Sequence, residues 1–593
     1  MLFAEYLANE KMPEGYKFSG PITKKSLKSN LTRLAQDKPE QYPDIVQNLK
    51  KVGDMFATYE GVSVGLDDIT PDYKVRDAVV REARKKMSTA KNKSDLIKVL
   101  LKAQKTGLDK VMQRDNALRR QVESGSRGKP GQLLKTIFSP MVVKGKSDIP
   151  QPYLIDRSYS EGLTPGQFWL TAGESRRELA TTQLATAIPG DSSKQLTATL
   201  NNVMVTTTDC GTTNGLEYST DDHQIKDRYE AKTNKLLTDS LIRQYKKAGK
   251  KTIIVRSPMT CKEHPGVCQM CYGKNIEGQL PTMGTNVGLR AAQMLSEPLT
   301  QMVLSAKHGG MMAKGEEAKL RGTMGFRQLV DIPKVFKDEA VLSYEDGKVN
   351  KVEKSPQGGH SVFINSKKYY VDPKREVLVK PGQSVAKGSQ ISDGIPNPRH
   401  VVELRGLGPG RKYMADTIYD IYNDSGVDID KRHVELLVKQ DLNQVKMLKN
   451  DPKGNFVRGE IVPYNQARNM VKAEKVGKPV NYDLIGNTLA SDHLHYTSGS
   501  PITKEMVNKL KMLGVKKVEV AGVDTPFEPI MRPMEQVPLM SQDWVSRLAH
   551  RRIKDTLLEG AAQGWSSPTH GTSPYPALIY GGSTFSEKEE NRY

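Results

Sequence analysis

Four cysteines are the side chains of this 593-residue chain best suited to bind a metal ion. Cys268 and Cys271 have the Cys-x-x-Cys spacing that lets two thiolates of one tight turn hold the same Zn²⁺. Cys261 lies seven positions upstream of Cys268, and Cys210 can supply a distant fourth ligand. A buried or redox-active Cys-x-x-Cys pair is the alternative, but one four-cysteine site accounts for all of them. We expect one structural zinc ion per chain, because a closed shell of four thiolates leaves no position for water.

The composition of the chain describes a large protein that attracts polyanions. Its length allows about three or four domains, since single cores stop growing near about 250 to 300 residues. The formal net charge of +21 favours nucleic acid as a partner, although the excess lysine could instead be solvated helix surface. There are only 11 Phe and 3 Trp, which indicates that much of the surface is solvated or contacts other chains.

The first residues of the sequence do not have the pattern of a targeting signal. The chain has no run of 18 apolar residues, and Met1 to Glu14 lacks a basic region followed by an apolar stretch. Four cysteines are also too few for a disulfide framework. We therefore expect a cytoplasmic protein without a membrane partner.

The elements that must position the cysteines follow from the apolar patterning. Apolar residues recur at helical spacing from Val75 to Arg120 without proline, which predicts two long antiparallel helices. Thr164 to Asn202 is also helical, with a kink predicted at Pro189-Gly190. Residues 336 to 393 predict a small β domain, with strands such as 361–364 and 369–371. Further helices are expected at the positions 414–422, 431–447 and about 544–562.

Several motifs occur in the order that they have in the β′ subunit of multisubunit DNA-directed RNA polymerases. The zinc-binding and trigger-loop region of that family is resembled by Asp209-Cys210-Gly211-Thr212, by Cys261 to Gly273, by Ala291 to Gln301 and by His308-Gly309-Gly310. Ser124 to Gly128 looks like the Ser-Gly-Ala-Arg-Gly turn of the family. The resemblance covers most of residues 60 to 580 and implies an irregular multidomain α/β fold with a structural zinc ion.

One motif of that family does not occur in the sequence. It is Asn-Ala-Asp-Phe-Asp-Gly-Asp, which binds the catalytic Mg²⁺. Asp67-Asp68 and Asp221-Asp222 lack its triad spacing, and we interpret them as helix caps or solvated carboxylates. The resemblance therefore implies the C-terminal part of a split β′, with Mg²⁺ bound mainly by another subunit. Cyanobacteria and plastids split β′ at a comparable place, but the divergence of this chain favours a large bacteriophage, acting in the host-cell cytoplasm.

The trigger loop of the family closes over the incoming nucleotide. By resemblance, Gln301 contacts the ribose, Leu304 packs on the base and His308 approaches the phosphates. Ser305 stands where the family has arginine. Lys307 occupies a usually aromatic position, and we expect it to replace part of the lost charge.

The resemblance also implies contacts outside the trigger loop. Arg127, in the Ser-Gly-Ala-Arg-Gly-like turn, joins the catalytic candidates. The segment from Glu161 to Gly211 aligns with the bridge helix, and four of its residues are expected to contact nucleic acid: Arg176, Thr186, Ala187 and Lys194. Small side chains at Thr186 and Ala187 would let the template base pack against the helix. An ordinary buried helix fits the same periodicity.

These motifs divide the chain into consecutive parts. They are an N-terminal helical and loop segment joining the rest of β′ (1–72), a rim helical hairpin (73–123), a loop with the bridge helix (124–208), a zinc module (209–280), the trigger-loop region (281–335), a small β domain (336–398), a C-terminal clamp and assembly region (399–582) and a disordered tail (583–593).

The predicted function is that of one subunit of a DNA-directed RNA polymerase, a nucleotidyltransferase, which is inactive alone. The expected partners are an N-terminal β′ chain, β-type chains, a promoter-specificity factor, template DNA, the RNA–DNA hybrid and NTPs. An inert β′ relative that regulates a polymerase is the main alternative, but the retention of Gln301, His308 and Arg127 argues against it. An unrelated zinc-ribbon protein that binds nucleic acid would not explain the ordered motifs.

Overall fold

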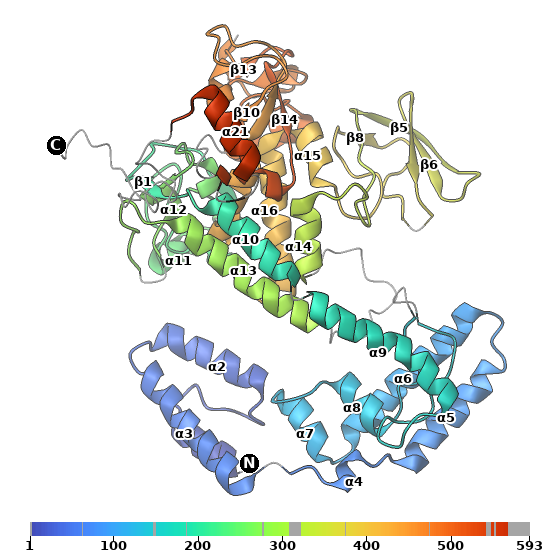
Figure 1. Cartoon of the computed structure of the whole chain (residues 1–593). Helices are drawn as coiled ribbons and strands as arrows, with labels where there is room; N and C mark the ends of the chain where they lie inside the picture. Colours follow the sequence, from blue (N-terminus) through green and yellow to red (C-terminus); the bar gives the residue numbers. More distant parts are fainter. Residues whose placement is uncertain are drawn as a thin grey trace. The chain divides into compact units, whose positions relative to one another are not determined.

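Helices dominate the N-terminal part of the chain in this computed structural model (Figure 1). They are α1 (Phe3–Glu10), α2 (Lys24–Asp37), α3 (Tyr42–Glu60), α4 (Leu66–Ile69), α5 (Tyr73–Met87), α6 (Lys93–Gln113), α7 (Ala117–Ser124), α8 (Pro130–Ile137) and α9 (Pro165–Ala185). The structure describes residues 3–61, 63–145, 150–185, 187–275, 278–306, 322–373, 375–473, 475–540, 547–548, 550 and 553–566. Within this part the chain forms two compact units, of which the first ends at Leu184 and the second begins at Ala185.

The two helices predicted between Val75 and Arg120 are confirmed as α5 and α6, which pack against each other. Asp72 caps the start of α5 by accepting a hydrogen bond from the backbone N–H of Val75, and Asn92 caps α6 in the same way. The apolar faces of both helices join one buried cluster with α8, which includes Val80 and Ala103. Burial of one helical face therefore holds this part of the first unit together.

The predicted helix from Thr164 to Asn202 corresponds to α9 and to α10 (Ala187–Leu200). Pro189 lies within α10 and is buried. The helical character of the segment is confirmed. Because α9 lies in the first unit and α10 in the second, the kink stays a prediction.

The second unit is built around a core of packed helices. They are α10, α13 (Val287–Ala306), α14 (Gly322–Asp331), α16 (Leu407–Asp424) and α17 (Lys431–Asp441), with the shorter helices α11 (Asp239–Lys247), α12 (Gln269–Tyr272), α15 (Pro398–Arg405), α18 (Tyr464–Ala467), α19 (Lys504–Met512) and α21 (Ile553–Gln563) around them. α13 packs against both α10 and α17. Figure 1 shows α13 beside α10. Fully buried Leu295, Leu299 and Leu437 belong to this core.

Small sheets surround the helices of the second unit. Two pairs are β1 (Val205–Thr207) with β4 (Val267–Cys268), and β2 (Leu216–Ser219) with β3 (Thr252–Val255). Two sheets have three strands, in the orders β10 (Ile461–Pro463), β9 (Gln444–Met447), β14 (Phe527–Ile530) and β11 (Lys475–Pro479), β13 (Lys517–Ala521), β12 (Thr488–Leu489). The described fold is thus mixed α/β, with helices and small sheets, as predicted.

The small β domain has the strand order β7 (Lys367–Val371), β6 (His360–Ile364), β5 (Gly347–Lys354), β8 (Ser384–Val385). It has its own buried cluster, to which Val349, Val362, Ile364 and Val371 contribute side chains from three strands. The predicted strands 361–364 and 369–371 are therefore confirmed.

One predicted helix ends earlier than expected. The helix predicted over 431–447 ends at Asp441, and Gln444–Met447 form strand β9 between β10 and β14. Leu442 leaves the helical conformation with φ −102° and ψ 65°, and the sheet then takes the backbone hydrogen bonds of the next residues. The helix predicted near 544–562 overlaps α21, and the tail 583–593 lies outside the described residues. None of the helices in the described part is long and apolar enough to cross a membrane.

Candidate metal centre

The four cysteines lie together in the second unit, as predicted from their spacing. The parallel pairing of β1 with β4 places Thr207 opposite Cys268, and Cys210 follows β1 after two residues. Cys261 directly follows the short 3-10 helix Pro258–Thr260. The four Sγ atoms lie within 4.8 Å of one another. The Sγ atom of Cys210 is 3.7 Å from those of Cys271 and Cys261.

This arrangement fits a tetrahedral metal ion. Metal–sulfur bonds of about 2.3 Å give a tetrahedron with sulfur–sulfur edges of about 3.8 Å, close to the two distances above. Backbone N–H groups also donate to two of the thiolates, from Cys268 to Cys261 at 3.4 Å and from Cys271 to Cys268 at 3.3 Å. Cys268 is fully buried. The four cysteines can therefore hold a metal ion in a closed shell.

The sulfurs influence one another when no metal is bound. Hydrogen bonds from Cys261 and its neighbours lower the pKa of Cys210 far below the value of a free thiol. The negative charge that collects there raises the pKa of Cys268 and Cys271, chiefly through their hydrogen bonds to Cys210. Four thiols so close together cannot all ionise without a cation, because the thiolates repel one another. A bound metal cation removes this repulsion by neutralising the thiolates.

Arg256 provides positive charge beside the cysteines. Its side chain is fully buried, and its Nη2 atom lies 3.5 Å from the Sγ of Cys210, 3.7 Å from that of Cys268 and 3.5 Å from that of Cys271. The same atom donates to Asp209 at 2.5 Å, which lowers the pKa of that carboxyl group. Arg256 thus offsets the negative charge of the thiolates.

The sequence analysis missed Arg256. Its only local signal is a charged residue directly after the apolar strand Thr252–Val255 and five positions before Cys261. A charge at such a place requires a buried partner. The partner cannot be read from the sequence, because Cys210 lies 46 positions away.

A second buried network connects the cysteine-bearing region to α17. Glu435 is completely buried and accepts hydrogen bonds from Arg228 at 2.6 and 3.0 Å and from Ser257 at 2.6 Å. Tyr218 also donates to Glu435, and burial raises the pKa of this tyrosine well above its usual value. Arg228 donates further to the backbone carbonyl of Arg256 at 3.1 Å. The Glu435 carboxylate on α17 therefore holds Tyr218, Arg228 and Ser257, which precede Cys261 in the chain.

The other predicted site residues are distributed over the two units. Gln301 is exposed near the end of α13, while Ala187 and Lys194 are exposed on α10, the helix that packs against it. Arg176 on α9 and Arg127 after α7 are exposed in the first unit. Leu304 lies in the last turn of α13, and its side chain is not among those described. Three predicted residues lie outside the described part of the chain: Thr186, Lys307 and His308.

The aspartate pairs have the structural roles expected of them. Asp68 accepts hydrogen bonds from the backbone N–H groups of Gly65 and Ala117, which lowers its pKa. Asp222 caps a short 3-10 helix by accepting from Gln224 at 2.9 Å, and Asp221 forms an exposed ion pair with Lys246. The interpretation of these pairs as caps and solvated carboxylates is confirmed for these three residues.

Comparison with known proteins agrees with the resemblance seen in the motifs. Residues 162–458, half of the chain, match the family model described as RNA polymerase Rpb1, domain 5. The chain therefore belongs to this family of RNA polymerase large-subunit domains. The metal-binding cysteines, α10, α13 and the small β domain all lie within the matched residues.

Curated relatives point to one subunit within that class. The chain is 26% identical to DNA-directed RNA polymerase subunit beta' of Symbiobacterium thermophilum, over 84% of this chain and 46% of that protein. It is 27% identical to the same subunit of Parafrankia sp., over 78% and 39%, and of Streptomyces avermitilis, over 82% and 41%. The chain thus spans less than half the length of these relatives and corresponds to a C-terminal part of β′.

Proposed function

We propose that the chain works as one subunit of a DNA-directed RNA polymerase and contributes the bridge helix, the trigger loop and the clamp base. The observation that carries this proposal is the polymerase family match over residues 162–458, which includes the trigger-loop motif from Gln301 to His308. We assign α9 and α10 to the bridge helix, and α13 and α14 to the two ends of the trigger loop, as the resemblance implies. The same resemblance supplies the names of most of the consecutive parts expected from the sequence. Their ranges are 1–72, 73–123, 124–208, 209–280, 281–335, 336–398, 399–582 and 583–593.

The packing of α10 against α13 supports this assignment. In the second unit the two helices pack closely, and both carry exposed candidates, Ala187 and Lys194 on α10 and Gln301 on α13. A small side chain at Ala187 lets a base approach the helix, while Lys194 attracts the nucleic-acid backbone. The resemblance adds Arg176 and Thr186 to the residues proposed to contact nucleic acid. Gln301 then selects the ribose by hydrogen bonding, and Leu304 packs on the base.

His308 is proposed to stabilise the charge that develops on the pyrophosphate leaving group. Phosphoryl transfer depends mainly on positioning and electrostatics, and an imidazole can be a cation or a proton donor near neutral pH. Lys307 adds positive charge that Ser305 does not supply. Arg127 is proposed as a further catalytic residue, as the resemblance implies. Mg²⁺, bound mainly by another subunit, supplies further charge neutralisation.

The partners are part of the proposal. They are an N-terminal β′ chain with the Mg²⁺-binding carboxylates, β-type chains, a promoter-specificity factor, template DNA, the RNA–DNA hybrid and NTPs. We also propose that the β′ subunit is split and comes from a large bacteriophage. Mass spectrometry of the native complex tests this: a separate chain with the carboxylate motif supports it, and a single long β′ chain refutes it.

Replacing His308 by alanine tests the catalytic part of the proposal. The variant is expected to slow nucleotide addition by roughly tenfold to a thousandfold, the scale of losing one positioned donor or charge partner. Binding of the nucleic-acid scaffold should hardly change. The measurement is single-turnover extension of a preassembled RNA–DNA scaffold by the reconstituted complex at saturating NTP.

His223→Ala is a control, because His223 is an exposed histidine outside the trigger-loop motif, with 65% of its side chain accessible. It should extend the scaffold at the parent rate. If the His308→Ala complex is equally fast while chemistry limits the rate, the trigger-loop assignment is wrong, and an inert β′ relative with a regulatory role becomes the better explanation.

We further propose that the four cysteines hold one structural Zn²⁺, since a closed shell of four thiolates in tetrahedral spacing is the usual site of that ion. The Arg256 guanidinium stabilises this charge-rich centre. Arg256→Gln is expected to weaken zinc binding about ten- to a hundredfold, as is typical when an outer-shell partner is lost. Competition with a chromogenic chelator measures the change in the full-length chain.

Arg243→Gln is the matched control for Arg256→Gln. Arg243 is an exposed arginine on α11 in the same region of the chain, and its loss should leave zinc affinity unchanged. Equal zinc affinity in the parent and in Arg256→Gln would contradict the role given to Arg256.

A further inference from the structure

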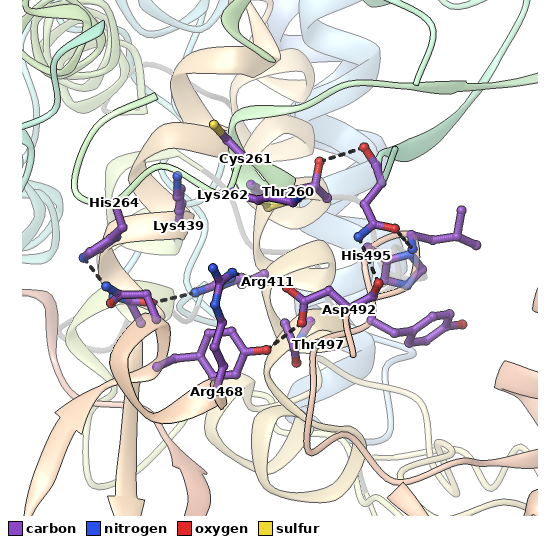
Figure 2. A pocket seen from close by; sticks show the side chains of 18 residues that line it. Thr260, Cys261, Lys262, His264, Arg411, Lys439, Arg468, Asp492, His495 and Thr497 are labelled. Atoms are coloured by element: carbon purple, nitrogen blue, oxygen red, sulfur yellow. Dashed lines mark hydrogen bonds and ion pairs between the residues drawn. The ribbon is translucent and has the colours of Figure 1, made fainter. Parts of the chain in front are cut away.

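A polar pocket lies in the second unit beside the metal centre, and Cys261 belongs to its lining (Figure 2). Its walls come from the loop 260–264, the first turns of α16, the end of α17, the segment 464–468 and the loop 492–497. Space for the centres of water-sized spheres amounts to about 40 Å³. A water molecule needs about 10 to 15 Å³ by this measure, so the pocket has room for about three waters or one small polyatomic ion.

The pocket has an excess of positive charge. Four cationic side chains line it, which are Lys262, Arg411, Lys439 and Arg468. Asp492 is the one carboxylate in the lining, and it already accepts hydrogen bonds from the Tyr464 hydroxyl at 2.7 Å and from the backbone N–H of Ser498 at 2.8 Å. Arg468 lies 3.8 Å from Asp492, so this carboxylate balances at most one of the cations. The remaining positive charge has no carboxylate partner in the lining.

Arg411 is the most unusual of these cations. It is only 6% exposed, and no carboxylate among the described residues lies within 4.0 Å of it. Its Nε atom donates to the Leu442 carbonyl at 2.7 Å and its Nη2 atom to Oδ1 of Asn443 at 3.1 Å. Its Nη1 atom has no hydrogen-bond partner in the described part of the chain. A buried guanidinium without an anion is costly, and burial lowers the pKa of Arg411 to about 10.

Lys439, near the end of α17, is a second buried cation of the pocket whose hydrogen bonds go to neutral groups. It is 4% exposed, and its Nζ atom donates to the backbone carbonyls of Gly266, at 3.1 Å, and Glu263. Both acceptors are neutral. The sulfurs of the metal centre balance part of the charge of Lys439.

His264 belongs to the lining of the pocket as a neutral ring. Arg411 donates to Oδ1 of Asn443, which fixes the orientation of that amide, so Nδ2 of Asn443 must donate to Nε2 of His264 at 3.0 Å. The proton of the neutral ring is therefore on Nδ1, which is buried and has no partner in the described part of the chain. Burial lowers the pKa of His264 to about 3, and this keeps the ring neutral.

We propose that this pocket binds one phosphate-sized oxyanion, held by Arg411 and Arg468 with Lys439 as a further donor. A guanidinium matches the oxygens of a phosphate group with parallel hydrogen bonds, and several cations facing one space suit a doubly charged ligand. The occupant is a free phosphate or phosphate monoester, or a phosphate of a nucleic-acid backbone. Its binding connects the loop that carries Cys261 to α16, α17 and the segments 464–468 and 492–497.

Inorganic phosphate is the probe that tests this site, by isothermal titration of the full-length chain loaded with its metal and free of excess metal. The parent is expected to bind one phosphate per chain. Arg411→Gln should lower the affinity at least tenfold, and Arg468→Gln several-fold. Arg458→Gln, an exposed arginine in the loop between β9 and β10, should bind like the parent.

The outcomes separate cleanly. The proposal is overturned if the folded parent shows no saturable phosphate binding. It is also overturned if folded Arg411→Gln and Arg468→Gln bind phosphate with the affinity of the parent. If Arg411→Gln fails to fold by circular dichroism, the half-buried Arg468 carries the test alone. Displacement of phosphate by a short single-stranded oligonucleotide identifies a backbone phosphate as the occupant, whereas displacement by a nucleoside monophosphate alone identifies a free monoester. The assay measures binding without transcription, so its result does not depend on the polymerase function.

Discussion

Cys268→Ser is expected to abolish stoichiometric zinc binding and to unfold the segment that carries the four cysteines. Cys268 is fully buried, ends β4 and caps α12 by accepting a hydrogen bond from the N–H of Cys271. Structural zinc contributes an apparent free energy of about 10 to 16 kcal/mol in zinc-finger peptides. This is comparable with the whole stability of a domain, about 5 to 15 kcal/mol, so local folding should depend on the ion.

Two measurements on the full-length chain check this result. Elemental analysis should find one zinc ion per parent chain and much less in Cys268→Ser, and limited proteolysis should cut the variant faster within residues 209–280. Gln279→Ser is the control, since Gln279 is exposed in the same region and touches none of the cysteines. A Cys268→Ser chain that retains one ion with the parent's affinity would contradict the four-cysteine centre.

Glu435→Gln should destabilise the second unit by about 3 to 5 kcal/mol, the cost of breaking a buried ion pair. The substitution keeps the shape of the side chain but leaves Arg228, which is 1% exposed, without its counter-charge. It also disturbs the hydrogen bonds from Ser257 and Tyr218. The midpoint of urea-induced unfolding, followed by circular dichroism, gives the change in stability.

Glu528→Gln is a matched control for this prediction. Glu528 pairs with Lys446 at 3.4 Å, but both side chains are 48% exposed, and an exposed pair contributes at most about 1 kcal/mol. The double variant Arg228→Met with Glu435→Leu should recover much of the lost stability, because no buried charge remains unpaired. Similar unfolding midpoints for Glu435→Gln and Glu528→Gln would show that the buried pair does not hold α17 in place.

The predictions of secondary structure that the structure confirmed rest on local sequence patterns. The helices α5 and α6 follow from apolar residues at helical spacing, and β6 and β7 from short β segments separated by Gly and Asp. Such signals depend on neighbours within one or two turns of the chain. The end of the helix at Asp441 was predicted wrongly, because the partners of β9 lie in β10 and β14, and β14 is some 80 residues further along.

The sequence by itself determined the family, the ligand types and the local spacing of Cys261, Cys268 and Cys271. It also supplies the motif around Gln301 and His308 on which the catalytic proposal rests. Only the tertiary structure decided how Arg256 meets three sulfurs, how Arg228 meets Glu435 across 207 positions and how Arg411 remains buried without a carboxylate. The physical reason is that a buried charge is stabilised by whatever the fold brings within a few ångströms, and chain separation places no limit on that distance.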